Sequence, residues 1–136
     1  MKRTLFTITA LCLCAIVAMG ATKAKMKERV NPFLTEYTTK YQIPPFEKIS
    51  YDDYLPAVKA GIEQHNAEIN AIIMRRDRPD FENTILALDN AGQLLTKVAN
   101  VFFALSESDG TPEMEELSKE ILPLITSHSD EVTMNP

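Results

Sequence analysis

The sequence has 136 residues, enough for one small domain, and its 45% hydrophobic and 24% charged residues are ordinary values for a globular chain. Its formal net charge of −5 argues against a nucleic-acid binder, because such proteins carry a basic patch. The only compact basic cluster is Arg75, Arg76 and Arg78, which Asp77 interrupts, and we expect a solvated loop between helices there.

Residues 1–20 have the pattern of a bacterial secretory signal peptide. Residues 2–3 are positive, residues 5–18 are apolar and uncharged, and a small-x-small cleavage pattern ends at Gly20. The apolar stretch is shorter than the ~20 residues that span a bilayer, which disfavours an uncleaved anchor. Cleavage after Ala24 is an alternative. We therefore expect export, most simply to the periplasm, and no stable membrane anchor after cleavage.

Both cysteines, Cys12 and Cys14, lie inside this signal segment. The mature chain is therefore expected to have no disulfide and no thiolate metal site. An exported domain without disulfides must be stabilised by its own core or by a larger partner.

Two segments without predicted helix follow the signal. Residues 21–30 are polar and rich in lysine, which predicts a flexible leader. Residues 31–49 form a predicted extended arm, because Pro44 and Pro45 disfavour helix. The arm has apolar side chains that could anchor it on a folded surface: Phe33, Leu34, Tyr37, Phe46 and Ile49.

A first helix is predicted to start between Ser50 and Asp53. These two residues resemble a capping box with Asp in place of Glu; alternatively, Asp53 is the cap and Pro56 lies in the first turn. The helix is expected to end before a turn at residues 75–80. Its apolar stripe has helical spacing and consists of Leu55, Val58, Ile62, Ile69 and Ile72.

A second helix is predicted from Asp80 or Asn83 to about Glu107, as one continuous amphipathic element. Gly92 lies in its middle, at a cost of about 1 kcal/mol relative to Ala, which the close approach of another helix would explain. The apolar face is broad, which implies burial between more than one neighbour. It consists of Ile85, Leu88, Leu94, Leu95, Val98, Ala99, Val101, Phe102 and Leu105.

A third helix is predicted after a turn at residues 106–110. Thr111 is the expected cap and Pro112 the first helical residue, and Pro123 is expected to kink or divide the helix. The helical stripe consists of Met114, Leu117, Ile121, Ile125, His128 and Val132.

No strand alternation is present, so the predicted class is all-α: an antiparallel helical hairpin plus a third, Pro-interrupted helix, all within residues 50–136. Three helices with such wide apolar stripes bury their faces incompletely by themselves. We therefore expect a truncated chain that belongs to a larger helical protein.

The two histidines do not form a recognisable metal motif. A helical zinc-peptidase site needs H-E-x-x-H, whereas Asn66 follows His65 and Ser129 follows His128. His65 lies on the core stripe, which favours a packed and hydrogen-bonded side chain over a ligand. His128 has Asp130 and Glu131 nearby but lacks a third convergent group.

Other catalytic patterns are also missing from the sequence. It has no G-x-S-x-G elbow and no Gly-rich phosphate loop. The acidic pairs Asp52-Asp53 and Glu115-Glu116 lie at expected helix starts, where they complement the helix dipole. We therefore assign no catalytic, cofactor-binding or metal-binding residue.

Several short sequence motifs, taken in order, resemble the N-terminal region of the peptidyl-dipeptidases of the thimet oligopeptidase family, the zinc metallopeptidases that include oligopeptidase A. The similarity covers nearly all of residues 31–136 and is greatest to the bacterial dipeptidyl carboxypeptidase branch. These motifs are Asn31-Pro32-Phe33-Leu34, Pro45-Phe46-Glu47-Lys48-Ile49, Tyr54-Leu55-Pro56-Ala57, Asp80-Phe81-Glu82-Asn83-Thr84-Ile85, Val101-Phe102-Phe103 and Ser127-His128-Ser129-Asp130-Glu131.

The resemblance implies a much larger enzyme that uses zinc to release dipeptides from the C-termini of oligopeptides. In that family an H-E-x-x-H motif and a later Glu, both far toward the C-terminus, hold the zinc. None of these positions occurs in this sequence. The resemblance therefore implies that this segment forms wall and scaffold around a substrate channel, with the catalytic region of the same protein as its partner.

A second hypothesis is a stand-alone periplasmic helical module for binding or interaction. It predicts a cooperative unfolding transition for residues 21–136, whereas a segment that lacks its partner is expected to unfold with weak cooperativity.

Overall fold

The computed structural model describes residues 29–135. All regular elements in this range are helical, without a strand, which confirms the predicted all-α class. The predicted signal peptide and all but the last two residues of the predicted leader lie outside the described residues.

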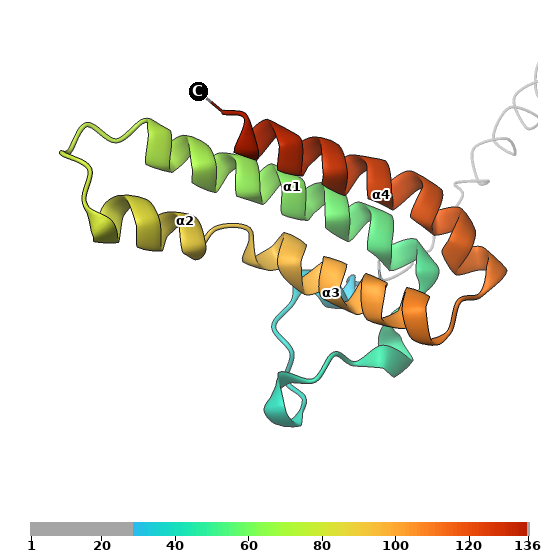
Figure 1. Cartoon of the computed structure of the whole chain (residues 1–136). Coiled ribbons are helices and arrows are strands. Elements are labelled where there is room, and N and C mark those ends of the chain that lie inside the picture. The colour runs from blue at the N-terminus through green and yellow to red at the C-terminus, as the bar shows by residue number, and fades with distance from the viewer. Residues whose placement is uncertain (1–28, 136) are drawn as a thin grey trace, which may run out of the picture.

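The architecture is a layer of three long helices (Figure 1). Helix α1 (Tyr51–Ile73) lies in the middle and packs against both α3 (Gln93–Ser108) and α4 (Pro112–Thr133). Helices α1 and α4 run in the same direction, and α3 runs against them. Because α1 has a neighbour on each side, it buries side chains against both.

The core forms where α1 faces its two neighbours and the start of the arm. Phe33 of the arm stacks against Tyr54 at 5.0 Å between ring centroids, and Tyr54 meets Phe102 at 5.7 Å. Burying such large rings makes a strong contribution to the hydrophobic stabilisation of the core. The buried cluster contains Phe33, Tyr54, Ala57, Val58, Leu95, Val98, Val101, Phe102, Met114 and Ile121.

The predicted helix starts are confirmed. Ser50 is the N-cap of α1, and the Asp53 carboxylate accepts hydrogen bonds from its backbone N–H at 2.7 Å and from its hydroxyl at 3.0 Å. The alternative in which Asp53 is the cap is wrong. Thr111 caps α4 by accepting from the Met114 N–H at 3.2 Å, with Pro112 as the first helical residue.

The continuous second helix predicted between Asp80 and Glu107 is wrong. The structure has a π-helix (η4, Phe81–Leu86), a short α2 (Ala87–Asp89), a turn, and then α3. The break occurs at Gly92, whose φ of 72° lies in the left-handed region, which non-glycine residues disfavour. On the N-terminal side of the break the predicted apolar stripe is not buried, since Ile85 and Leu88 are exposed.

Helix α4 does not divide at Pro123. It is assigned as one helix from Pro112 to Thr133, and Pro123 lies on its exposed side. The side chains that the sequence placed on its apolar stripe do face inward: Met114, Ile121 and His128 are buried.

The arm consists of three short 3₁₀ turns joined by extended residues: η1 (Pro32–Leu34), η2 (Lys40–Gln42) and η3 (Phe46–Lys48). Its first turn enters the core through Pro32 and Phe33, and Ile49 at the end of the arm packs against the core while partly buried. None of the helices in residues 29–135 combines the length and the hydropathy that crossing a membrane requires.

Candidate functional site

The structure brings together the two histidines that the sequence analysis treated separately. Nε2 of His128 on α4 lies 2.9 Å from Nδ1 of His65 on α1, a hydrogen bond between residues 63 positions apart. Their rings meet edge to face, with centroids 4.9 Å apart. His65 is half-buried and His128 is 4% exposed. The prediction that His65 is a packed, hydrogen-bonded side chain is confirmed.

The second nitrogen of His128 is the unusual atom of this pair. Nδ1 is buried and has no hydrogen-bond partner among the described residues. An unpaired N–H costs more in a protein interior than an unpaired acceptor, so the neutral pair is best arranged with His128 donating from Nε2 to Nδ1 of His65. Nδ1 of His128 then carries no proton.

The surroundings of His128 oppose its protonation. Burial lowers the pKa of His128, the neighbouring His65 lowers it further, and Glu131 partly offsets both effects. The direction follows from the cost of placing a charged imidazolium away from water. At neutral pH the His128 ring is therefore neutral.

The backbone at Gly92, which directly precedes α3, packs against the His65 ring of the pair. A Cβ built on Gly92 would lie 2.9 Å from Nδ1 of His65 and 3.0 Å from its Cε1, so the ring packs directly on the glycine backbone. The Glu68 carboxylate accepts the Gly92 N–H at 2.7 Å. This bond, and a second from Gln64 at 2.8 Å, lower the pKa of Glu68.

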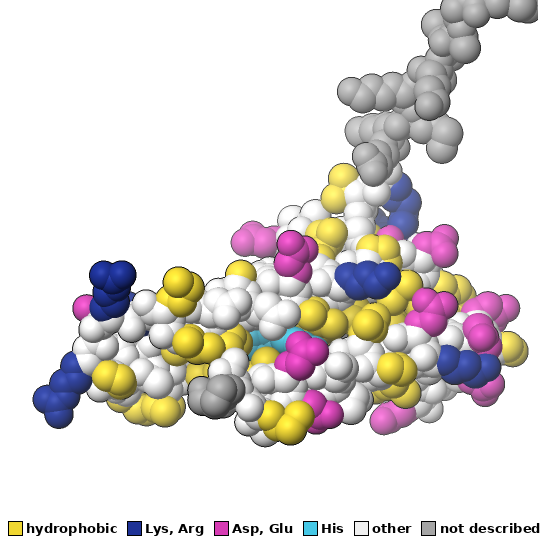
Figure 2. All heavy atoms as spheres, turned by 90° about the horizontal axis from the view of Figure 1, so that it is seen from above, with side chains coloured by type: hydrophobic (Ala, Val, Ile, Leu, Met, Phe, Trp, Pro, Cys, Tyr) yellow, Lys and Arg dark blue, Asp and Glu magenta, His cyan; other side chains and the backbone are white. Residues whose placement is uncertain are grey.

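A groove between α3 and α4 exposes one side of the histidine pair. Its cavity volume is about 340 Å³, and its walls are mainly apolar, with Leu95 and Phe103 from α3 and Ile125 from α4. Figure 2 shows histidine surface in the middle of one face, with hydrophobic side chains on both sides of it. The groove offers hydroxyls from Thr96 and Ser129 but no side-chain carboxylate or amine.

The arrangement does not form a metal centre. Among residues 29–135, no three side chains of His, Cys, Asp or Glu gather around one point. The two imidazole nitrogens face each other rather than a shared third position. What the pair can do chemically is hold a proton between α1 and α4.

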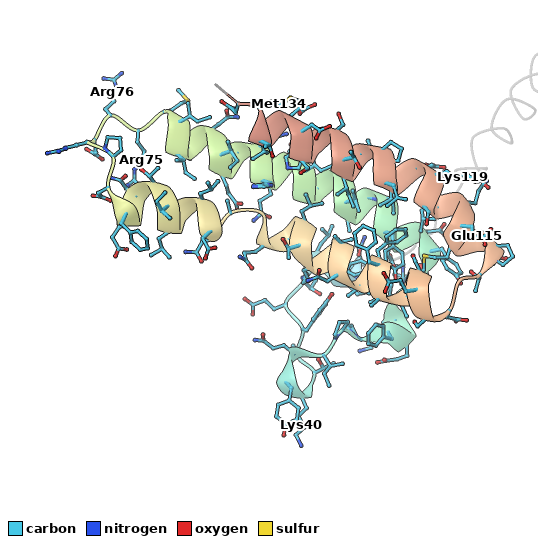
Figure 3. All side chains as sticks on the ribbon, viewed as in Figure 1. Lys40, Arg75, Arg76, Glu115, Lys119 and Met134 are labelled. Atoms are coloured by element: carbon cyan, nitrogen blue, oxygen red, sulfur yellow. The ribbon has the colours of Figure 1, made fainter. Side chains whose placement is uncertain are left out.

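The other charged groups singled out from the sequence lie apart from the pair. Arg75, Arg76 and Glu115 are exposed, and Figure 3 shows the two arginines at the end of the molecule opposite to Glu115. The solvated loop predicted around residues 75–78 is thus confirmed. Asp52 is also exposed, whereas Asp53 is buried.

Asp53 forms an ion pair that was not predicted from the sequence. The Arg29 guanidinium donates to both carboxylate oxygens of Asp53 at 2.7 Å, and it also donates to the Lys48 carbonyl oxygen. Burial raises the pKa of Asp53, but the bonds from Arg29 and Ser50 outweigh it, and the net shift is downward. Arg29 was predicted to lie in a flexible leader; instead it ties the chain to the start of α1.

An apolar surface lies at the far end of the hairpin, around the loop between α1 and α2. We call it the distal patch. It consists of Ile73, Met74, Phe81, Ile85, Leu86 and Leu88, all exposed. Phe81 alone is 65% exposed, which is unusual for a phenylalanine next to other exposed apolar side chains.

Sequence reasoning missed the histidine pair because its members are 63 positions apart. His65 and Glu68 stand three apart on one face of α1, and both contact Gly92 in the folded chain. These contacts join distant parts of the chain, so the sequence pattern around Gly92 does not contain them.

Comparison with known proteins gives curated relatives but no matching family profile. The chain is 38% identical over 106 residues to dipeptidyl carboxypeptidase of Escherichia coli (strain K12), which is 78% of this chain and 16% of the relative. It is 35% identical over 105 residues to dipeptidyl carboxypeptidase of Salmonella typhimurium, which is 77% of this chain and 15% of the relative. Oligopeptidase A of Salmonella typhimurium is 25% identical over 99 residues, 73% of this chain and 14% of the relative.

Proposed function

Because this chain is related to the dipeptidyl carboxypeptidases and, more distantly, to oligopeptidase A, we propose that it is a scaffold segment of a peptidase of that kind. The parent protein would release dipeptides from the C-termini of oligopeptides. This segment would form part of the wall around the substrate channel and would take no part in the chemistry.

The observation that carries the proposal is a similarity that covers most of this chain but only a small part of the relative. The similarity extends over 78% of this chain but only 16% of the Escherichia coli relative. The rest of such a protein would therefore supply the reacting groups. The described residues agree with this division, since their most notable polar cluster is a pair of imidazoles bonded to each other.

The distal patch supports a scaffold role. Its exposed phenylalanine, isoleucine and leucines would each gain roughly 25 cal/mol per Å² of apolar surface covered by a neighbouring part of the parent protein. If the distal patch stayed exposed to water, it would be an aggregation-prone surface.

Zinc would be the cofactor of the parent. The residues described here do not fit a zinc site, because a protein zinc site needs three or four convergent ligands and no such group is found in residues 29–135. The metal would therefore be held by other parts of the parent. The signal-like residues 1–20 support export, so the proposed location is the periplasm.

A chimera tests the proposal. The segment of the Escherichia coli dipeptidyl carboxypeptidase that matches this chain would be replaced by residues 29–135, and release of dipeptides from a short peptide would be measured. We expect a soluble chimera with activity, and no activity from this chain alone. A matched chimera that also carries Gly61→Asp, which disrupts the contact between α1 and α3, should lose both solubility and activity.

Two results would contradict the proposal. One is a folded chimera that binds zinc but releases no dipeptide. The other is dipeptide release by this chain alone. The alternative, a stand-alone periplasmic binding module, predicts that the purified chain is monomeric and unfolds in a single sharp thermal transition.

A further inference from the structure

The second half of α4 has a single fully buried side chain, together with Leu124 and Ile125, which are partly buried against the core. Helix α4 has three buried side chains, Met114, Ile121 and His128. The first two hold its N-terminal half, together with a 3.0 Å hydrogen bond between Tyr51 and Thr111. After Ile121, His128 is the only buried side chain, and its polar contact is His65 on α1.

We propose that His65 and His128 form a proton-sensitive clasp, which holds the second half of α4 against α1 at neutral pH and releases it when both imidazoles are protonated.

The chemistry of the pair gives the clasp two steps. In the neutral pair, one ring donates an N–H to the lone pair of the other. A first proton on Nδ1 of His128 leaves this bond in place, because its Nε2–H still donates to Nδ1 of His65. A second proton removes the last lone pair at the contact, so no N–H···N bond is possible and two cations face each other at about 3 Å.

The charged groups around the pair are few. From α1, the Glu68 carboxylate lies beside the pair, and from α4, Glu131 favours the charged form of His128. The residues of α3 that line the groove, such as Thr96, Asn100 and Phe103, carry no ionisable group. Burial and the neighbouring His65 lower the pKa of His128, whereas Glu131 raises it. The net shift in the pKa of His128 is downward.

The sign of the pH dependence follows from this direction. His128 binds a proton less readily in the closed state than in an open one, where its pKa returns to about 6.5. Opening therefore takes up a proton below about pH 6.5, and the opening equilibrium rises by up to about tenfold per pH unit for that proton. Above this range the clasp stays closed.

Hydrogen exchange of the full chain, read by mass spectrometry at pH 7.5 and pH 5.0 and corrected for intrinsic rates, tests the clasp. We expect a loss of protection in peptides from residues 122–133 at pH 5.0 relative to residues 112–120. The matched control is His65→Asn with His128→Gln. These amides place a nitrogen or oxygen where Nδ1 and Nε2 lie, yet they do not titrate, so the drop should disappear.

Equal protection at both pH values in the unmodified chain would overturn the proposal, and so would an equal drop in the amide variant. If the amide variant fails to fold, ¹⁵N spectra of the histidine rings in the unmodified chain decide. We expect two coupled titration steps, with the second displaced to lower pH. Independent single-step titrations of the two rings would refute the clasp.

Discussion

Replacing Gly92 with alanine separates the observed structure from the continuous helix that the apolar pattern predicts. In a continuous helix, Gly92→Ala would raise the free energy of unfolding by about 1 kcal/mol, because alanine is the better helix former. In the observed structure, Gly92 has a φ of 72°, where an L-residue with a Cβ is strained. The two accounts therefore differ in sign.

The expected loss has two parts. Holding alanine in the left-handed region costs about 1–2 kcal/mol. The new Cβ would also lie 2.9 Å from Nδ1 of His65, so the ring must move and its bond to His128 is disturbed, at about 0.5–1.5 kcal/mol. We expect Gly92→Ala to lower the free energy of unfolding by about 1.5–3.5 kcal/mol in total.

Urea denaturation followed by circular dichroism at 222 nm and pH 7.5 measures this change. The control is Gly92→Ala in a His65→Ala background, where the ring is gone. There the loss should shrink to the backbone part of about 1–2 kcal/mol. An increase in stability on Gly92→Ala, in either background, would refute the broken helix and restore the continuous one.

Three further predictions follow from other contacts. Gly61→Ala places a Cβ 2.8 Å from the Leu95 Cα and should lower the unfolding free energy by about 1–3 kcal/mol; an unchanged melting temperature would contradict this close approach of α1 and α3. Asp53 has a lowered pKa, so its stabilising effect is present above about pH 4 and is lost as the pH falls further. Asp53→Asn should therefore reduce the loss of stability between pH 4 and 2 in urea titrations, and an unchanged loss would exclude the pair with Arg29. Burial raises the pKa of Tyr54 to about 12, and its hydroxyl has no partner among the described residues, so Tyr54→Phe should be neutral or stabilising by up to about 1 kcal/mol in the same assay. A clear loss would reveal a missed hydrogen bond.

The helix starts could be predicted because they depend on neighbours in the chain. Ser50 and Asp53 lie within one turn of each other, and Thr111 directly precedes Pro112. Capping is decided by such short-range hydrogen bonds, so the sequence contains the whole interaction. The apolar stripe of α4 was readable for the same reason, since its period reflects one continuous helix.

The break at Gly92 could not be predicted in this way. The apolar positions on both sides of it keep a helical spacing, so the pattern continues across the turn. What decides the local conformation is the carboxylate of Glu68 and the ring of His65, both supplied by α1. Tertiary contacts of this kind override local propensity.

The candidate site was the least predictable part. The bond between His65 and His128 depends on α1 and α4 running side by side in the same direction, with the rings at matching heights. No spacing rule within one sequence contains that information. The position of Arg29 was missed because a lysine-rich segment favours a flexible leader, whereas its guanidinium finds a buried carboxylate.

The most direct test of the central claim is the mass of the native protein that carries this sequence, measured by immunoblot with an antibody raised against residues 29–135. As a scaffold segment of a peptidase, the sequence should be found in a single species several times heavier than the 15.3 kDa of this chain. A native species of 15.3 kDa or less, without any heavier one, would contradict the account.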